Sequence, residues 1–190
     1  MATETAGSPH RRRAPEHVET ARLVLSPPIA ADVVSIFTRY AGDAEATRYL
    51  GWPRHTNAAM TQGFIAFSDG QWSRTGMGPY VIRAKADGRL LGGTGLSLDA
   101  EGVASTGYVL APDAWGRGLA TEALAAMVRV AGTLGLRRLT ASCHPAHVAS
   151  QRVLVKGGFR RETVQRLEFP NLAPGVVQDA LVFGRSVLPD

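Results

Sequence analysis

The stretch from Trp115 to Ala123, with the sequence WGRGLATEA, constrains the fold of this chain most strongly. It places two glycines and an arginine directly before a strongly apolar segment with helical spacing. The start of a helix exposes unpaired backbone N–H groups and the positive end of the helix dipole, so it can hold an anion. Glycines let an anion approach the backbone closely, and Arg117 adds a positive charge. The stretch therefore predicts a phosphate-binding loop that opens a helix.

Length and composition favour one folded domain. A chain of 190 residues is long enough to bury a core, so we expect a disordered arm over residues 1–19 and a single domain over residues 20–190. No apolar run reaches the roughly 18 residues of a membrane helix, and the N-terminus lacks an apolar signal core. We therefore expect a cytoplasmic protein without a membrane partner. Cys143 is the only cysteine, which excludes an internal disulfide and a cysteine zinc cluster, and we expect no metal.

The formal net charge of +5 is carried almost entirely by arginine. Such basicity is typical of proteins that bind nucleic acid, the ribosome or a small polyanion. The only dense basic run, Arg11–Arg13, falls in the expected arm, and a generally basic, solvated surface explains the charge equally well. A nucleic-acid partner is therefore allowed but not required.

The chain alternates between apolar strands and helices. Apolar runs predict strands at residues 22–26, 80–85, 90–98, 103–110, 138–143, 159–168 and 180–187. Helical spacing predicts helices near residue 32, after residue 57, near residue 117 and from Ser150, a natural cap. Met60, Phe64 and Phe67 form the expected buried stripe of the second helix. Because a hairpin turn at residues 86–89 joins antiparallel strands that lead into the 115–123 stretch, the predicted class is mixed α+β.

Two common nucleotide-binding motifs do not fit. A Walker loop requires G-x-x-x-x-G-K-[ST], which the chain lacks. A dinucleotide fingerprint that begins at Gly116 requires glycine or alanine at position 121, where Thr121 stands. Its strands would also alternate with helices in parallel units, whereas a hairpin precedes this loop. The bound phosphates therefore belong to another ligand.

Two blocks resemble the GNAT N-acetyltransferase superfamily. Leu110–Ala123 (LAPDAWGRGLATEA) resembles its acyl-CoA motif. His147–Phe159 (HVASQRVLVKGGF) is similar to the N-x-x-S-x-R-V-L-x-K-x-G-F helix of the branch that contains the ribosomal-protein N-acetyltransferases, the Rim-type group. Thr20–Leu23 and Trp52–Thr56 also resemble that branch, so the resemblance spans roughly residues 20–187.

The resemblance implies an α+β fold with a mostly antiparallel central sheet that is splayed in the middle, flanked by helices, and holds acetyl-CoA in the gap. Pantetheine would pair along Val109, Leu110 and Ala111, as a strand added to an open edge. Arg117 and Arg152 are candidates for the outer phosphates. The full set of implied cofactor-binding residues is Val109, Leu110, Ala111, Trp115, Gly116, Arg117, Gly118, Leu119, Ala120, Thr121, His147, Ser150 and Arg152. Trp115 and His147 stand where the family often has Gln or Arg, and Asn, respectively.

Moving an acetyl group from a thioester to an amine requires a deprotonated amine, a donor for the oxyanion and a proton for the thiolate. The tyrosine acid of some relatives would align with Leu154, so Ser150 is the candidate proton relay, with helix capping as its alternative role. A carboxylate that many relatives carry is replaced near Ser105. The candidate catalytic residues are Ser150, Ser105 and His144. For the general base, His55, Asp99, Glu101 and a water chain stay open beside His144.

The acceptor is expected to be a primary amine, either a protein N-terminus or a small amine such as an antibiotic or a polyamine. Trp52, His55 and Tyr108 are the candidate substrate-binding residues. Aromatic and imidazole groups such as Trp52 and His55 favour concave sites, with ordinary packing as the alternative for Trp52. For Tyr108, packing under the cofactor is favoured over a catalytic role. We expect direct transfer through a ternary complex. A non-catalytic acyl-CoA-binding or sensing module and a ribosome- or nucleic-acid-associated protein are the alternative functions. A homodimer is left open.

Overall fold

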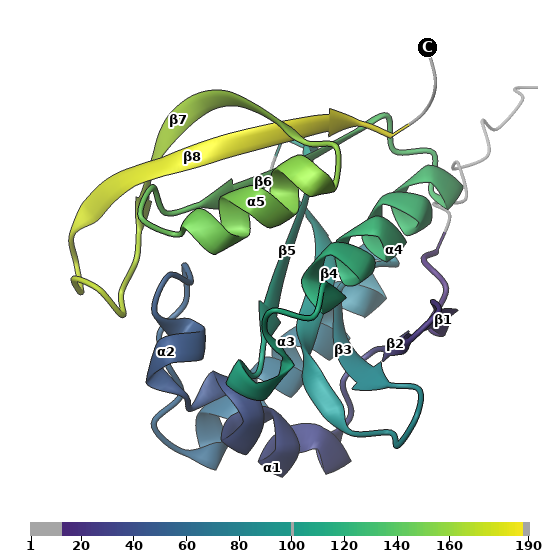
Figure 1. Cartoon of the computed structure of the whole chain (residues 1–190). Helices are drawn as coiled ribbons and strands as arrows, with labels where there is room; N and C mark the ends of the chain where they lie inside the picture. Colours follow the sequence, from purple (N-terminus) through teal and green to yellow (C-terminus); the bar gives the residue numbers. More distant parts are fainter. Residues whose placement is uncertain (1–12, 100, 188–190) are drawn as a thin grey trace, which may run out of the picture.

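The computed structural model describes residues 13–99 and 101–187 (Figure 1). Eight strands form one sheet in the order β1-β2-β3-β4-β5-β6-β8-β7. The strands are β1 Val18–Glu19, β2 Leu23–Ser26, β3 Pro79–Ala84, β4 Leu90–Leu98, β5 Ala104–Leu110, β6 Arg138–Cys143, β7 Arg160–Glu168 and β8 Val177–Ser186. The helices are η1 Ala30–Asp32, α1 Val33–Ile36, the π-helical turn η2 Phe37–Ala41, α2 Ala44–Thr47, α3 Ala58–Thr75, η3 Pro112–Ala114, α4 Leu119–Thr133 and α5 Val148–Lys156.

The sheet is splayed between β5 and β6. All neighbouring strands pair antiparallel except these two, which are parallel and joined at the single pair Ser105–Thr140. Beyond that pair β5 continues toward α4 while β6 turns away with β8 and β7 (Figure 1). A parallel pair that ends after one register position leaves most of the facing edge of β5 without a strand partner. This arrangement confirms the predicted fold class.

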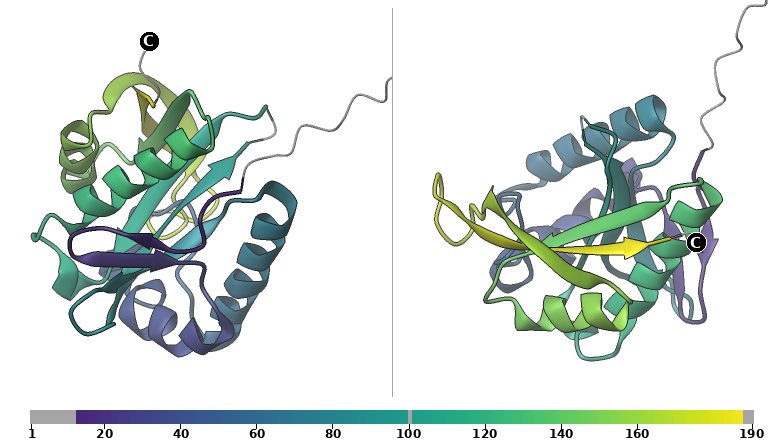
Figure 2. Two further views of the ribbon diagram at one scale, coloured as in Figure 1. Left: turned by 90° about the vertical axis from the view of Figure 1, so that its right-hand side faces the viewer. Right: turned by 90° about the horizontal axis from the view of Figure 1, so that it is seen from above.

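Helices cover both faces of the sheet. On one face α4 packs against β4 and β5 over the larger core, which includes Leu96, Leu110 and Met127. On the other face α1, η2 and α3 pack over a smaller core around Ile36, Tyr40 and Val81. The helix α5 packs against β6 and α4 (Figure 2). None of the helices in residues 13–99 and 101–187 is long and apolar enough to cross a bilayer.

The N-terminal segment differs from the expected arm. Within residues 13–19, the backbone N–H of Ala14 donates to Gly76 O over 2.8 Å, and the Tyr80 hydroxyl donates to Pro15 O over 2.8 Å. Val18 pairs with Leu25 of β2. These contacts bury Ala14, so the domain begins before residue 20. The remainder of the expected arm, residues 1–12, lies outside the described residues.

The last helix begins earlier than predicted. The N-cap of α5 is His147, and Ser150 is the third residue of the helix. A turn in which the His147 N–H donates to His144 O over 2.9 Å closes before the helix and fixes its start. The expectation that Ser150 caps this helix is therefore wrong, and its hydroxyl is available for other contacts.

Candidate active site

The segment from Trp115 to Thr121, called the amide loop below, consists of the turn after η3 and the first three residues of α4. Gly116 and Gly118 have φ of 72° and 74°, a left-handed conformation that favours glycine. The first helical N–H that bonds back is that of Glu122, which donates to Gly118 O over 3.1 Å. The N–H groups of the preceding helical residues therefore point off the end of α4. A Cβ on Gly116 would meet nothing within 4 Å, so the loop is open on its outer side.

Arg22, at the start of β2, ties the amide loop to the sheet. Its Nη1 donates to Arg117 O over 3.0 Å, and its Nε donates to Glu122 Oε2 over 2.7 Å. Glu122 Oε1 also accepts from the Thr20 hydroxyl over 2.5 Å and from the Arg22 N–H over 2.8 Å. Burial raises the pKa of Glu122, but these hydrogen bonds outweigh it and lower the pKa below its usual range. Arg22 is a functional candidate that motif reading named only as part of a resemblance.

Not all backbone groups at the C-terminal end of β5 face the gap. The Ala111 N–H donates to Leu91 O over 2.8 Å, and alternation along an antiparallel pair turns the backbone of Val109 toward β4 as well. The backbone groups of Tyr108 and Leu110 face the gap. Pairing of pantetheine along Val109, Leu110 and Ala111 stays a prediction, and of these three residues Leu110 is the one whose backbone faces the gap.

Trp115 occupies one backbone group on the gap side of β5. Its indole Nε1–H donates to Leu110 O over 2.8 Å. The Leu110 carbonyl is thus occupied, which leaves the Leu110 N–H and the Tyr108 backbone on the gap side. Arg117 and Arg152 are both exposed, and neither forms an ion pair with another residue in the described ranges.

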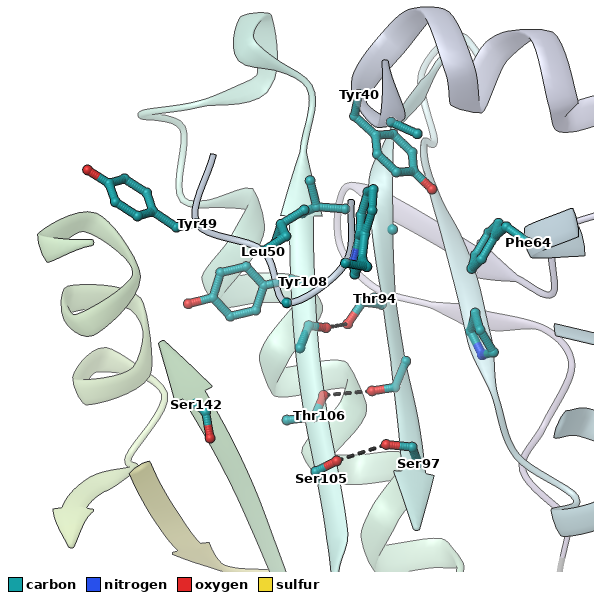
Figure 3. A pocket seen from close by; sticks show the side chains of 18 of the residues that line it. Tyr40, Tyr49, Leu50, Phe64, Thr94, Ser97, Ser105, Thr106, Tyr108 and Ser142 are labelled. Carbon is teal, nitrogen blue, oxygen red and sulfur yellow. Dashed lines mark hydrogen bonds between the residues drawn. The ribbon is translucent and has the colours of Figure 1, made fainter. Parts of the chain in front are cut away.

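A cavity of about 970 Å³, called the central cavity below, opens between the two halves of the molecule (Figure 3). Its walls come from the five strands β3 to β7, from the junction of α1 and η2, from α3 and α5, and from the segment between α2 and α3. Seven of the residues predicted from the sequence line it: Trp52, His55, Ser105, Tyr108, Val109, His147 and Ser150. Met60, Phe64 and Phe67 also line it, and Phe67 is 54% exposed. The expected buried stripe of α3 is therefore wrong, because these residues face the cavity.

Tyr108 and Ser150 meet across the gap between β5 and α5. The Tyr108 hydroxyl lies 2.9 Å from Ser150 Oγ and 3.1 Å from Ser150 O. Burial raises the pKa of Tyr108 to about 12, although the hydrogen bond with Ser150 opposes the shift. Burial likewise raises the pKa of the Cys143 thiol, which lines the cavity beside them. The Tyr108 hydroxyl and the Cys143 thiol therefore stay protonated and neutral near pH 7.

His144 is held outside the cavity lining. Its Nδ1 accepts the Ala146 N–H over 3.1 Å, and its Nε2 lies 3.3 Å from Gln178 Oε1. The ring also packs edge-on against Phe169 and stacks on Tyr49. With one nitrogen accepting and the other placed to donate, the ring has no free lone pair. The structure does not support His144 as a general base.

Among the other candidates for the general base, His55 lines the cavity and the two acidic residues do not. Asp99 accepts hydrogen bonds from the Glu101 and Val103 N–H groups in a turn, and neither acidic residue lines the cavity. Ser105 shares a 2.8 Å hydrogen bond with Ser97. His55 does line the cavity, with Nδ1 2.8 Å from the Thr61 hydroxyl, and burial lowers its pKa.

Two residues of the C-terminal half escaped sequence reasoning. Glu168, at the end of β7, lines the cavity although it is exposed. Asn171 holds the segment before α3: its Nδ2 donates to Thr47 O and Trp52 O over 2.8 and 2.9 Å, and its Oδ1 accepts the Arg54 N–H over 2.7 Å. No motif marks either position, because both act through contacts between segments more than 100 residues apart.

Comparison with known families gives the class of protein. The model of the acetyltransferase (GNAT) domain matches residues 22–160. The chain belongs to the GNAT acetyltransferase family. It is an acetyltransferase by family, and the predicted superfamily is confirmed.

Individual relatives agree with this assignment. The chain is 31% identical over 157 residues to the uncharacterized N-acetyltransferase YoaA of Bacillus subtilis, covering 78% of this chain and 85% of that protein. Among solved structures, the ribosomal L7/L12 α-N-protein acetyltransferase RimL in complex with coenzyme A is 19% identical, with a TM-score of 0.77 over 90% of this chain and 98% of that one. The microcin C7 self-immunity acetyltransferase MccE in complex with acetyl-CoA and AMP is 20% identical, with a TM-score of 0.76 over 88% and 93%. These structures share the fold.

Proposed function

We propose that this protein transfers the acetyl group of acetyl-CoA directly to a primary amine bound in the central cavity. The observation that carries the proposal is the position of the Tyr108–Ser150 pair. It lies on the open side of β5, where the edge that runs from the amide loop reaches the cavity. A donor held along that edge and an amine in the cavity would meet there.

The described residues fit the phosphate-rich end of acetyl-CoA. The free N–H groups at the start of α4 and the open space at Gly116 suit a pyrophosphate. Arg117 and Arg152 are exposed cations that can meet the outer phosphates. Pantetheine would pair with the Leu110 N–H and the Tyr108 carbonyl on the free edge of β5. That RimL and MccE were solved with coenzyme A and acetyl-CoA supports this assignment.

The reaction balances without a covalent enzyme intermediate. The amine nitrogen forms a C–N bond with the acetyl carbonyl carbon, the C–S bond breaks, and the proton lost by nitrogen is matched by one that the thiolate gains. The products are an N-acetyl amine and coenzyme A thiol. The Tyr108 N–H, which also faces the gap, can donate to the oxyanion of the tetrahedral intermediate.

The Tyr108–Ser150 pair would serve the leaving sulfur as a hydrogen-bond donor and relay. A free thiol has a pKa of about 8.5, whereas the pKa of Tyr108 is raised to about 12. Net proton transfer from the phenol to the thiolate is therefore unfavourable. The hydroxyl pair instead stabilises the developing charge and passes on a proton that originates from the amine.

His55 is the proposed proton acceptor for the amine. It lines the cavity, and its lowered pKa keeps it neutral at pH 7. A neutral imidazole can take a proton directly or through a water. Replacing it should lower the rate without changing acetyl-CoA binding.

A non-catalytic acyl-CoA-binding module is the second candidate. One observation favours it: within the described part of the chain, exposed Glu168 is the only carboxylate that lines the cavity. Leu154, where some relatives carry a tyrosine, lines the cavity as well.

The transferase and the binding module predict different release of coenzyme A thiol from acetyl-CoA. The protein is mixed with acetyl-CoA and a panel of primary amines, and coenzyme A thiol and acetylated amine are quantified together, while calorimetry measures acetyl-CoA binding. The proposal expects both products in equal amounts for at least one amine. Tight acetyl-CoA binding with no acetylated amine from any acceptor would favour the binding module.

A further inference from the structure

The central cavity is almost free of ionised groups. Its lining, as far as the structure describes it, contains no lysine, arginine or aspartate. Its one carboxylate, on Glu168, is exposed. Burial lowers the pKa of His55 and His147, the two lining imidazoles, so both are neutral at pH 7. A second charge on an acceptor would therefore lose its hydration without gaining a partner.

The hydroxyls of β4 and β5 that line the cavity already have hydrogen-bond partners. Ser97 and Ser105 bond each other over 2.8 Å. The Thr94 hydroxyl donates to Gly107 O over 2.8 Å, and the Thr106 hydroxyl donates to Gly95 O over 2.8 Å (Figure 3). Both threonine hydroxyls donate their protons within the sheet, and the serine pair uses one of its two protons, so few free donors remain for the carbonyl groups of a polar acceptor.

One face of the sheet leaves room for a flat group. Gly95 and Gly107 are directly paired, and Gly93 lies two residues along β4, so the three glycines share a face. A Cβ on Gly93 would lie 3.0 Å from the Tyr40 hydroxyl, which identifies this face as the one below η2. A Cβ on Gly107 would meet nothing within 4 Å. Tyr40 covers Gly93, and the backbone at Gly78 lies 2.9 Å from a Cβ on Gly95, so the missing side chain of Gly107 is the one that opens the floor of the cavity.

Aromatic side chains stand over this floor. Trp52 and Phe64 pack against the core cluster that contains Tyr40, and all three line the cavity. Phe64 and Tyr40 lie on the same side of the strands in Figure 3. Aromatic walls over a glycine floor favour a planar apolar group, which they can contact by stacking or edge-on.

We infer that the acceptor is a small primary amine carried on an apolar, ring-bearing body with no second charge. This inference rests on the proposed function and narrows it, because it selects against polyamines, amino acids and peptide N-termini. A polyamine would need more carboxylates than the single exposed Glu168 that lines the cavity, and a peptide would bring backbone carbonyls for which the lining has few free donors.

The first test uses acceptors that share one ring and differ in charge. The kcat/KM is measured for 2-phenylethylamine, for L-phenylalanine, which adds a carboxylate, and for 4-(2-aminoethyl)benzylamine, which adds a second amine. Spermidine and a short alanine-terminated peptide complete the panel. We expect 2-phenylethylamine to exceed each of the others by about a hundredfold or more, because an unpaired buried charge or amide is strongly disfavoured.

The second test fills the floor. Gly107→Val adds a side chain that points into open space, at a strand position with ordinary φ. We expect kcat/KM for 2-phenylethylamine to fall by about tenfold or more, with acetyl-CoA affinity by calorimetry changed less than about twofold. Thr163→Val, at an exposed position of β7, introduces the same side chain away from the cavity and is the matched control. An equal loss in both variants, or none in Gly107→Val, would overturn the inference.

The outcomes distinguish a wrong acceptor class from a wrong transferase assignment. Faster turnover of spermidine, the peptide or L-phenylalanine than of 2-phenylethylamine would overturn the inference and leave the transferase standing. Acetyl-CoA binding without turnover of any amine would overturn both. Preference for 2-phenylethylamine together with its selective loss in Gly107→Val would support the inference.

Discussion

The amide loop and the central cavity are built in opposite ways. The loop spans seven consecutive residues, and its proposed ligand contacts are backbone N–H groups whose directions are set by two left-handed glycines. The cavity is assembled from side chains of segments scattered along the chain, from η2 to β7. The first is polar, open and charged at its rim; the second is aromatic and nearly uncharged. Backbone N–H groups are common to all residues except proline, so the loop depends on the glycines that set its conformation, whereas a site made of side chains can change its ligand while the fold is kept.

The largest expected effect lies where the two regions meet. Tyr108→Phe removes one hydroxyl from the Tyr108–Ser150 pair, and kcat should fall by about a hundredfold, as for other lost transition-state donors. The KM for acetyl-CoA should change less than about twofold, because the backbone of β5 is untouched.

Tyr80→Phe is the control for this change. It removes the same atom from a buried tyrosine whose hydroxyl donates to Pro15 O, so it should lower the melting temperature and leave kcat nearly unchanged. Equal losses of kcat in the two variants would contradict a special role for Tyr108.

The backbone construction of the amide loop is tested by two equivalent glycines. Gly116 and Gly88 have φ of 72° and 70°, and a Cβ on either would meet nothing within 4 Å. Valine at either position should cost similar stability, since a left-handed conformation costs an L-residue about 1–2 kcal/mol. Only Gly116→Val should weaken acetyl-CoA binding, by about tenfold or more. Calorimetry on both variants measures this, and unchanged affinity in Gly116→Val would place the phosphates elsewhere.

Replacing Arg22 should have a smaller effect, confined to the binding of acetyl-CoA. In Arg22→Ala the Arg117 carbonyl loses its donor and the Glu122 carboxylate stands near the phosphates without its cation. We expect the KM for acetyl-CoA to rise about fivefold, with kcat unchanged and partial recovery in Arg22→Lys. Arg166→Ala, which breaks the exposed pair with Asp179, is the control. A loss in kcat alone would show that Arg22 does not act by positioning the loop.

The smallest effect concerns pH and the cavity. Burial lowers the pKa of His55 and His147 in the folded state, so the unfolded chain binds more protons as pH falls through about 6.5. Stability should therefore be lower at pH 5 than at pH 7. His55→Gln and His147→Asn should each reduce that difference when melting temperature is followed against pH. A wild-type melting temperature that stays constant over this range would argue against neutral imidazoles.

The same contrast explains what the sequence could reveal. Strands β4 and β6 lie at the predicted bounds, and the glycine pattern at residues 116–118 identified the loop, because local conformation is encoded in neighbouring residues. Ser150 lines the cavity but does not cap α5 as the sequence suggests, since the start of α5 depends on the turn at His144.

The cavity could be predicted only in part. Trp52 and His55 were found through an aromatic loop, but Phe64 and Phe67 were assigned to a buried stripe, because helical spacing cannot tell a core face from a cavity wall. Glu168 and Asn171 carry no local signal. Their placement depends on how β7 and the segment after it return to the N-terminal half.

The central claim, direct transfer between these two regions, is tested most directly by intact-protein mass spectrometry with labelled acetyl-CoA. The protein is analysed before and after addition of the best amine, with Cys143→Ser as a comparison because this thiol lines the cavity. The account predicts labelled acetyl on the amine and unmodified protein at every time point. An acetylated Cys143 that forms before the amine is added and disappears at the turnover rate would contradict it.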